Sequence, residues 1–174
     1  MSVFIAGGTG FIGRRLTRSL VAQGEEVTVM DIAPQDGDFD DFGDKVRVVR
    51  GDITHFDDVM DKMAAAGADR TINLAYYIGS HHPPHMAMKL NVIGMDNFFE
   101  ASRLTGAQRV VYASSLAVYG FQRNYGERAV NEEDFKHGEN QYSMHKIFNE
   151  WQAQDYIDKH GMSISGVLPT NVSG

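Results

Sequence analysis

The chain has 174 residues, 43% of them hydrophobic, and carries a formal net charge of −7. This length and composition are typical of one globular domain with a sizeable core, which we place at residues 1–174. The acidic balance argues against nucleic acid as a partner, and the absence of cysteine excludes disulfides, thiolate catalysis and cysteine-ligated zinc. No apolar run approaches the ~20 residues that span a membrane, and no signal-peptide pattern opens the chain. We therefore expect a cytoplasmic protein without a membrane partner.

A glycine-rich turn lies between an apolar run, residues 3–6, and a helical pattern that ends at about Gln23. We expect a strand, a turn and a helix. Gly7 has access to the backbone angles of a sharp turn, the missing side chain at Gly10 lets a pyrophosphate approach the backbone, and Gly13 lets the helix pack close to the strand. The N–H groups at the start of the helix would then face the phosphates. A tight turn without a ligand is the alternative.

The second predicted strand, residues 27–30, ends at Asp31. An acid about 20 residues past such a glycine turn is placed to accept hydrogen bonds from both ribose hydroxyls of an adenosine. The same carboxylate would repel a 2′-phosphate. Asp31 therefore favours NAD over NADP, and the alternative is an acid that merely ends a strand.

Two loops contain residue types that bind metals. Residues 34–44 are acidic but lack the ordered spacing of a calcium loop, so we interpret them as a solvated surface. Residues 76–85 hold His81, His82 and His85, together with two prolines and no acidic ligand. We interpret this segment as a loop beside the substrate, and we predict no metal site.

The remaining segments alternate between helical and strand-like patterns. Residues 116–140 carry no strong helix signal, and Thr54 is a candidate N-cap. If Asn91 is buried within its helix, it needs partners, so we expect it to bond to backbone near the cofactor. The further predicted strands are residues 46–49, 71–75, 109–113 and 163–168, and the predicted helices are residues 56–66, 86–105 and 142–159.

Strands that alternate with helices predict an α/β fold. We expect a Rossmann-type doubly wound parallel sheet, joined by right-handed crossovers and covered by helices on both faces. Ligands of such sheets bind outside the carboxyl ends of the strands. The glycine turn, Asp31 and Ser115 all follow predicted strands directly, so we expect them to share one site.

Tyr142 and Lys146 are four residues apart in a predicted helix, so their side chains share one face. An ammonium near a phenol stabilises the phenolate and lowers its pKa from about 10. A phenol tuned in this way exchanges a proton with a substrate hydroxyl near neutral pH. Ser115 can hydrogen-bond to the same substrate oxygen. Together these groups would let a hydroxyl lose its proton as its carbon loses a hydride.

The combination of these motifs resembles the extended short-chain dehydrogenase/reductase superfamily, in particular its NAD-dependent epimerase/dehydratase group. The resemblance covers the whole chain, and the motifs stand in the family's order. The matching residues are Gly7-Gly8-Thr9-Gly10-Phe11-Ile12-Gly13, Asp31, Gly51-Asp52-Ile53, Asn73-Leu74-Ala75, Asn91-Val92-Ile93-Gly94, Ser114-Ser115-Leu116-Ala117-Val118-Tyr119-Gly120, Tyr142, Lys146 and Pro169-Thr170-Asn171-Val172.

The resemblance implies roles for these residues. Tyr142 would be the acid/base, Lys146 would also hold the nicotinamide ribose, and Ser115 rather than Ser114 would be the catalytic serine. Substrate would contact Ser115, Tyr142 and Asn171. The residues expected to contact NAD are Gly7, Gly10, Phe11, Ile12, Gly13, Asp31, Asp52, Ile53, Leu74, Ala75, Tyr76, Asn91, Ala113, Tyr142, Lys146 and Pro169.

The resemblance also implies a choice of functions. A sugar-nucleotide epimerase or dehydratase comes first, because sugar nucleotides are the family's most frequent substrates. The alternatives are a dehydrogenase or reductase of a sugar, a steroid or another small carbonyl or alcohol, and an NAD-binding module without turnover. Family members continue into a C-terminal substrate lobe, so we expect this chain to be a truncated part of such an enzyme.

A homodimer is a further expectation from the resemblance. The helices at residues 86–105 and 142–159 correspond to those that form a four-helix dimer contact in the family. Phe98, Phe99, Phe148 and Trp151 would supply apolar surface for this contact, or they would fill the core of the monomer.

Overall fold

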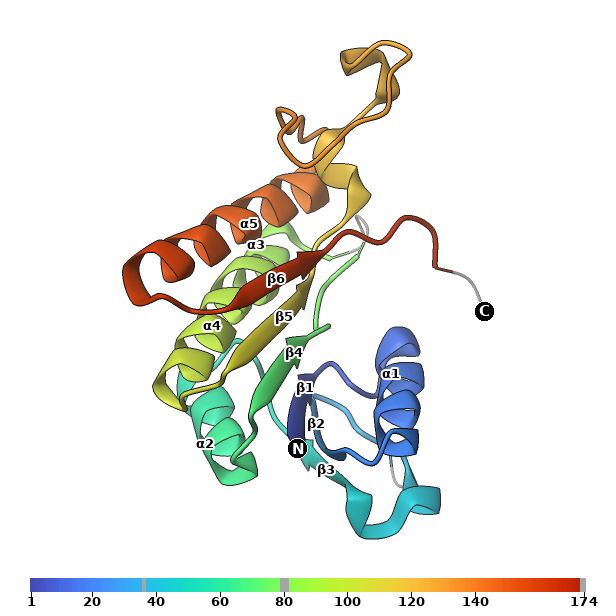
Figure 1. Ribbon diagram of the computed structural model, residues 1–174, viewed down its shortest axis with the longest axis vertical. Helices are drawn as coiled ribbons and strands as arrows, with labels where there is room; N and C mark the ends of the chain where they lie inside the picture. The colour runs from blue at the N-terminus through green and yellow to red at the C-terminus, as the bar shows by residue number, and fades with distance from the viewer. Residues whose placement is uncertain (36, 79–81, 173–174) are drawn as a thin grey trace.

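A computed structural model describes residues 1–35, 37–78 and 82–172. Its strands form one parallel sheet in the order β3-β2-β1-β4-β5-β6. The order reverses beside β1, as in a doubly wound sheet, and this confirms the Rossmann-type fold (Figure 1). The strands are β1 Ser2–Ala6, β2 Glu26–Asp31, β3 Val46–Arg50, β4 Arg70–Asn73, β5 Arg109–Ala113 and β6 Ile164–Val167.

The helices lie unequally on the two faces of the sheet. Figure 1 shows α1 on one face, and α2, α4 and α5 on the other. Within the described residues, no helix is long and apolar enough to cross a membrane. The helices are α1 Phe11–Ala22, α2 Phe56–Ala66, α3 Pro84–Met88, α4 Gly94–Leu104 and α5 Gln141–His160, and a π-helical turn, Lys89–Ile93, joins α3 to α4.

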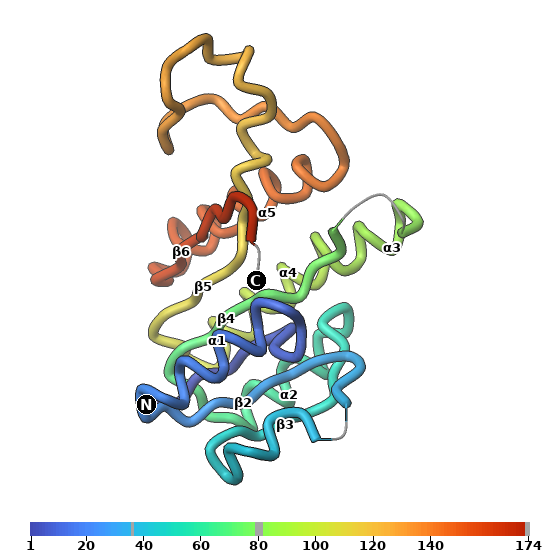
Figure 2. Tube along the Cα trace, turned by 90° about the vertical axis from the view of Figure 1, so that its right-hand side faces the viewer, coloured from blue at the N-terminus to red at the C-terminus, as the bar shows by residue number. Residues whose placement is uncertain are grey.

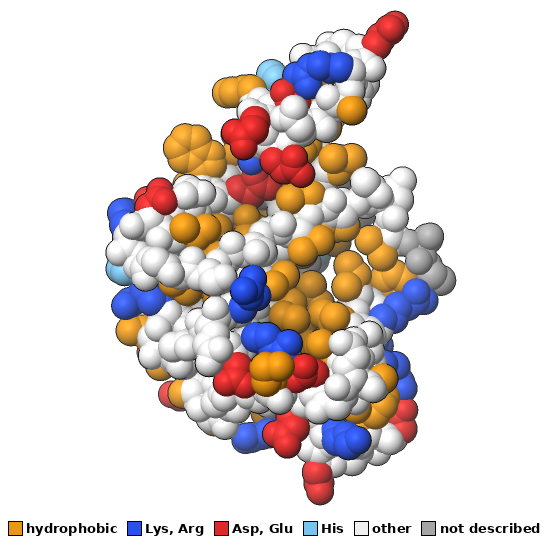
Figure 3. Space-filling model, viewed as in Figure 1, with side chains coloured by type: hydrophobic (Ala, Val, Ile, Leu, Met, Phe, Trp, Pro, Cys, Tyr) orange, Lys and Arg blue, Asp and Glu red, His pale blue; other side chains and the backbone are white. Residues whose placement is uncertain are grey.

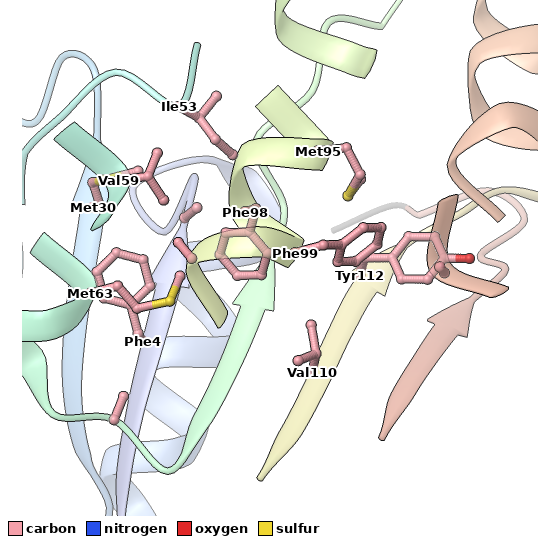
Figure 4. Close-up of a cluster of buried hydrophobic side chains, with 14 residues drawn as sticks. Phe4, Met30, Ile53, Val59, Met63, Met95, Phe98, Phe99, Val110 and Tyr112 are labelled. Carbon is pink, nitrogen blue, oxygen red and sulfur yellow. The ribbon is translucent and has the colours of Figure 1, made fainter. Parts of the chain in front are cut away.

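Alternation along β1 explains how the sheet supplies two cores. Val3 and Ile5 face α1, and Phe4 and Ala6 face the other helices, because successive strand residues point to opposite faces. The larger core lies between the sheet and α2 and α4, as Figure 4 shows. Its labelled members include Phe4, Met63, Met95, Phe98, Phe99, Val110 and Tyr112.

The expected cover on both faces is present only in part. On the face that carries α1, hydrophobic side chains lie open between α1 and β6 in the view of Figure 3. Val167 of β6 is 55% exposed. Within the described residues, this face therefore has its helix over the β1–β2 side alone, and the β5–β6 side is uncovered.

The helix predicted at residues 86–105 forms, but with a different start and an interruption. It begins at Pro84, and its middle is the π-helical turn Lys89–Ile93. Phe98 and Phe99 are fully buried, so of the two roles considered for them they fill the core of the monomer and supply no surface for a dimer contact. Their position in the core follows from the phase of α4, which turns both rings toward the sheet.

The acidic segment 34–44 is more than the solvated surface that its composition suggests. Phe39 is only 4% exposed, because it packs in the core beneath α1. Two of the segment's acids are held by arginines of α1: Asp38 pairs with Arg14 at 2.5 Å, and Asp41 with Arg18 at 2.6 Å. The segment is therefore anchored along α1.

The predicted N-cap of α2 is also wrong. His55 occupies that position and makes no capping bond with its side chain. The hydroxyl of Thr54 instead donates to Asp52 Oδ1 at 2.8 Å, and the backbone N–H of Thr54 donates to the same oxygen at 2.9 Å. The hydroxyl of Thr54 is therefore bonded within the turn at Asp52 and does not cap α2.

Residues 121–140 project beyond the rest of the molecule, as both Figure 1 and Figure 2 show. The one O–H of Tyr125 is shared between the carbonyl oxygens of Tyr119, at 2.8 Å, and Phe135, at 2.6 Å. An ion pair joins Lys136 to Glu150 of α5. These bonds give the segment a fixed path without a long helix, which agrees with the weak helix signal of its sequence.

Candidate functional site

Two adjoining cavities lie at the carboxyl ends of the strands, where the fold predicts a site. Their volumes are about 230 and 440 Å³. Four residues line both cavities, so the two form one groove: Gly7, Gly10, Leu74 and Tyr76. The first cavity lies toward β2 and β3, and the second lies toward β5 and α5.

The three glycines of the turn have different surroundings. Gly7 has a φ of +76°, and a Cβ there would meet the backbone nitrogen of Ala75 at 2.6 Å. A Cβ on Gly13 would meet Gly8 Cα at 2.5 Å. At Gly10 a Cβ would come no closer than 3.3 Å, to Gly7 O. Gly7 and Gly13 are therefore required by the fold, whereas Gly10 has the least crowded surroundings of the three and lines both cavities.

The first cavity holds the acid at the end of β2. Asp31 lines it, and its carboxylate accepts the N–H of Thr9 at 3.2 Å and the N–H of Ala33 at 3.4 Å. Asp31 is therefore tied to the glycine turn across the mouth of the cavity. Besides the shared residues, three more of those expected to contact NAD line the same cavity: Asp52, Ile53 and Ala75.

The second cavity brings together the three residues expected to be catalytic, Ser115, Tyr142 and Lys146. Ser115 ends the extended backbone after β5, and its hydroxyl oxygen accepts the N–H of Ala117 at 3.2 Å. Tyr142 and Lys146 come from the first turns of α5, which a capping box on Asn140 begins. Five further expected contacts line this cavity: Phe11, Ile12, Gly13, Ala113 and Pro169.

Lys146 is 2% exposed, which is rare for a lysine. Its ammonium donates a hydrogen bond of 2.5 Å to the carbonyl oxygen of Ala113 and lies 3.2 Å from the ring centre of Tyr76. Burial lowers the pKa of Lys146 from 10.5 to about 7, while the negative charge of Glu150 opposes the shift. The distance from this ammonium to the ring centre of Tyr142 is 5.7 Å. An amine that titrates near neutral pH thus lies beside a phenol.

Asn91 is buried behind the groove and supports its wall. Its side-chain oxygen accepts the N–H of Tyr77 at 2.8 Å, and its amide nitrogen donates to the carbonyl of Tyr77 at 3.1 Å. The expected bonds to nearby backbone are therefore present. The same amide nitrogen lies 3.4 Å from Nδ1 of His145, so α5 and the segment after β4 meet at this side chain.

Two predicted features, Asn171 and the histidines of the loop at residues 76–85, do not lie in the lining of the groove as far as the structure describes them. Asn171 is exposed, and its neighbours Thr170 and Val172 line the second cavity instead. Of the histidine loop, residues 79–81 lie outside the described part of the chain, which leaves His82 and His85. Within residues 1–35, 37–78 and 82–172, no group of three His, Cys, Asp or Glu is placed to hold a metal ion.

Sequence reasoning did not foresee the surroundings of Ser114. This buried serine lines the second cavity and donates a hydrogen bond of 2.5 Å to Glu150, which also pairs with Lys136. A chain of polar contacts thus runs from the projecting segment to the floor of the groove. The position of Glu150, four residues after Lys146, was the one available signal, because that spacing puts both on one side of α5.

The sheet order, the glycine turn after β1 and the groove with serine, tyrosine and lysine define a class, the extended short-chain dehydrogenase/reductase fold. The chain belongs to the NAD dependent epimerase/dehydratase family, whose family model matches residues 3–174. This confirms the resemblance that the motifs indicated.

Individual relatives are more distant. Protein CapI of Staphylococcus aureus is 25% identical over 185 residues, which cover 100% of this chain and 55% of CapI. A 3-beta-hydroxysteroid dehydrogenase of Mycolicibacterium neoaurum is 32% identical over 123 residues, 67% of this chain and 32% of that protein. The crystal structure of UDP-glucose 4-epimerase from Brucella ovis in complex with NAD matches with a TM-score of 0.87 at 26% identity, over 99% of this chain and 53% of that one. This chain spans about half the length of CapI and of the Brucella enzyme.

Proposed function

We propose that this chain binds NAD and forms the cofactor-binding part of an oxidoreductase-type enzyme that acts on a secondary alcohol. One observation carries the proposal. A single groove has Asp31 at one end, the glycine turn where its two cavities join, and Ser115, Tyr142 and Lys146 at the other end. The known structure of a family relative with NAD supports the choice of cofactor.

The residues of the groove fit such a cofactor. No side chain caps the start of α1, and its first turn contains no acid, so its N–H groups can hold a pyrophosphate. Gly10 lines both cavities and has no side chain, which leaves room for a pyrophosphate to approach the backbone. The carboxylate of Asp31 has lone pairs left for ribose hydroxyls after its two backbone bonds.

The chemistry of the second cavity is proton transfer at a substrate oxygen. Bound NAD would supply an acceptor for the hydride that leaves the substrate carbon. Tyr142 would take the hydroxyl proton, and the ammonium of Lys146 would stabilise the phenolate from which Tyr142 acts. Ser115 would donate its O–H to the same substrate oxygen and keep it in place.

We propose a sugar-nucleotide epimerase or dehydratase as the activity of the whole protein. The likeness to a UDP-glucose 4-epimerase supports this choice. The second candidate is an NAD-dependent dehydrogenase, and the higher local identity to a 3-beta-hydroxysteroid dehydrogenase favours it. An epimerase or dehydratase returns the hydride, whereas a dehydrogenase releases NADH. Absorbance at the NADH band during turnover of the full-length protein separates the two.

The first experiment is a calorimetric titration of this chain with NAD and, in parallel, with NADP. We expect NAD to bind and NADP to bind more weakly. Gly10→Ala should weaken NAD binding at least tenfold, which is about 1.4 kcal/mol, while the melting temperature stays near that of the wild type. Ser19→Ala, an exposed position farther along α1, is the control and should bind NAD as the wild type does. A folded wild-type chain that binds neither NAD nor NADP would overturn the proposal.

Asp31 should set the choice between the two cofactors. Asp31→Asn keeps the size of the side chain but removes the negative charge that a 2′-phosphate would meet. We expect the preference for NAD to narrow by about tenfold, roughly 1.4 kcal/mol. The ratio of the two dissociation constants is the measurement, and an unchanged ratio would show that Asp31 only ends its strand.

A module that binds NAD without turnover is the remaining alternative. Tyr142→Phe in the full-length protein removes only the hydroxyl that moves the proton. We expect activity to fall by roughly a hundredfold or more, with NAD affinity nearly unchanged. Equal activity in Tyr142→Phe and in the wild type would remove the catalytic assignment and favour the module.

A further inference from the structure

Tyr76 lies at the junction of the two cavities, in contact with Tyr142, which is expected to move the proton, and with Lys146, which is expected to stabilise the phenolate of Tyr142. The Lys146 ammonium is 3.2 Å from the centre of its ring. The ring of Tyr142 stands nearly perpendicular to it, at 87° and 5.5 Å between centres. Tyr76 comes from the segment after β4, whereas the other two come from α5, so the contact joins two elements.

We infer that Tyr76 is a positioning residue whose ring face holds the Lys146 ammonium in place beside Tyr142. The inference rests on the proposed function, in which these two groups serve the proton transfer. It assigns the effect to the ring and none to the Tyr76 hydroxyl. That hydroxyl oxygen is buried and has no hydrogen-bond partner within the described part of the chain.

The physical reason is the cost of a buried ammonium. Lys146 has left water almost completely and needs other groups to face its charge. Four groups face the charge of Lys146: the carbonyl of Ala113 on β5, the ring of Tyr76 after β4, and Tyr142 and Glu150 on α5. The negative face of an aromatic ring attracts a cation at this distance, and desolvation strengthens the attraction.

Two alternatives to tyrosine separate the ring from the hydroxyl. Phenylalanine keeps the ring face, so it should serve as well as tyrosine. Leucine is apolar and keeps Lys146 out of water, but it offers no such face. In Tyr76→Leu the charged form of Lys146 is therefore less stable, and the pKa of Lys146 should fall.

The test follows the Lys146 pKa by ¹³C NMR on protein carrying ¹³C-labelled lysine. The Cε signal of Lys146 is assigned by its loss in Lys146→Met. We expect the wild type and Tyr76→Phe to share one midpoint, and Tyr76→Leu to titrate lower by about half a pH unit or more. Tyr76→Met is a second variant without a ring and should repeat the shift if Tyr76→Leu does not fold.

An unchanged or higher midpoint in the ringless variants would overturn the inference, and so would an equal shift in Tyr76→Phe. The outcome does not depend on NAD. If the wild-type chain failed to bind NAD, the proposed function would fall, but the titration would still decide whether the ring of Tyr76 holds Lys146.

Discussion

At the scale of single residues, the buried Lys146 makes the clearest prediction about stability. Its pKa is about 7 in the folded chain and 10.5 as an ordinary lysine. Between these values the unfolded chain binds more protons, so the stability of the wild type rises with pH across this window. Below pH 7 the folded chain carries the full cost of the buried charge. Lys146→Met removes the group and with it this slope.

We therefore expect Lys146→Met to be more stable than the wild type near pH 7, and the difference to shrink as the pH approaches 10. The limiting slope for one such group is about 1.4 kcal/mol per pH unit. Urea denaturation at three pH values measures it. Lys159→Met, at an exposed lysine of the same helix, is the control and should show no such trend. If the difference in unfolding free energy between Lys146→Met and the wild type did not change with pH, the lowered pKa of Lys146 would be wrong.

Single residues also show which features of the site can be predicted from the sequence. The glycines, Asp31, Ser115, Tyr142 and Lys146 were all identifiable, because a motif or a helical spacing fixes each one. The structure gathers them at one groove. The contact of Tyr76 with Lys146 and the bond of Ser114 to Glu150 were not identifiable. They join residues far apart in the chain, and no local pattern encodes a distance across the fold.

At the scale of elements, the π-helical turn is the feature that couples α5 to the wall of the groove. A π turn closes hydrogen bonds between residues five apart, in place of the four of an α-helix. The carbonyl of Asn91 accepts a hydrogen bond of 2.8 Å from Asn149, and that of Val92 accepts one of 3.3 Å from Gln152. Because the side chain of Asn91 also holds Tyr77, this turn connects the helix of Tyr142 and Lys146 to the segment after β4.

Asn149→Ala should be costly, since it removes a buried hydrogen bond to the carbonyl of Asn91 and empties the space of a fully buried side chain. We expect a loss of roughly 1–3 kcal/mol in the free energy of unfolding. Gln154→Ala, at an exposed position of α5, is the matched control and should change stability by less than about 0.5 kcal/mol. Urea denaturation of both variants is the measurement. Equal losses in the two would show that the turn does not depend on this bond.

Element positions were largely predictable, and their details were not. The strands and helices lie close to the predicted ranges because apolar runs mark the strands, and helical spacing or cap residues mark the helices. The π turn has no such signal, because residues 86–105 have an ordinary helical pattern. The turn contains Asn91, whose bond to Tyr77 depends on the folded structure and not on a local sequence pattern. The burial of Phe39 within an acidic segment was equally hidden, because it depends on where α1 lies.

At the scale of the whole molecule, the outer side of α5 bears directly on the expected dimer. With Phe98 and Phe99 buried in the core, the apolar candidates that remain are Phe148, 51% exposed, and Trp151, 73% exposed. Met144, one turn before Phe148, is also exposed, so the three form a stripe along α5. We propose that two copies of the chain pair through this stripe, since large exposed apolar side chains grouped on one face are typical of interfaces.

Trp151→Glu should shift the dimer toward monomer, because it places a charge at the most exposed residue of the stripe. We expect the dissociation constant to rise at least tenfold, about 1.4 kcal/mol. Phe135→Glu is the matched control, since Phe135 is an aromatic residue 77% exposed that belongs to the projecting segment and not to α5. Sedimentation velocity at micromolar concentrations measures the mass of each. A monomeric wild type would refute the dimer, and an equal effect of Phe135→Glu would place the contact elsewhere on the molecule.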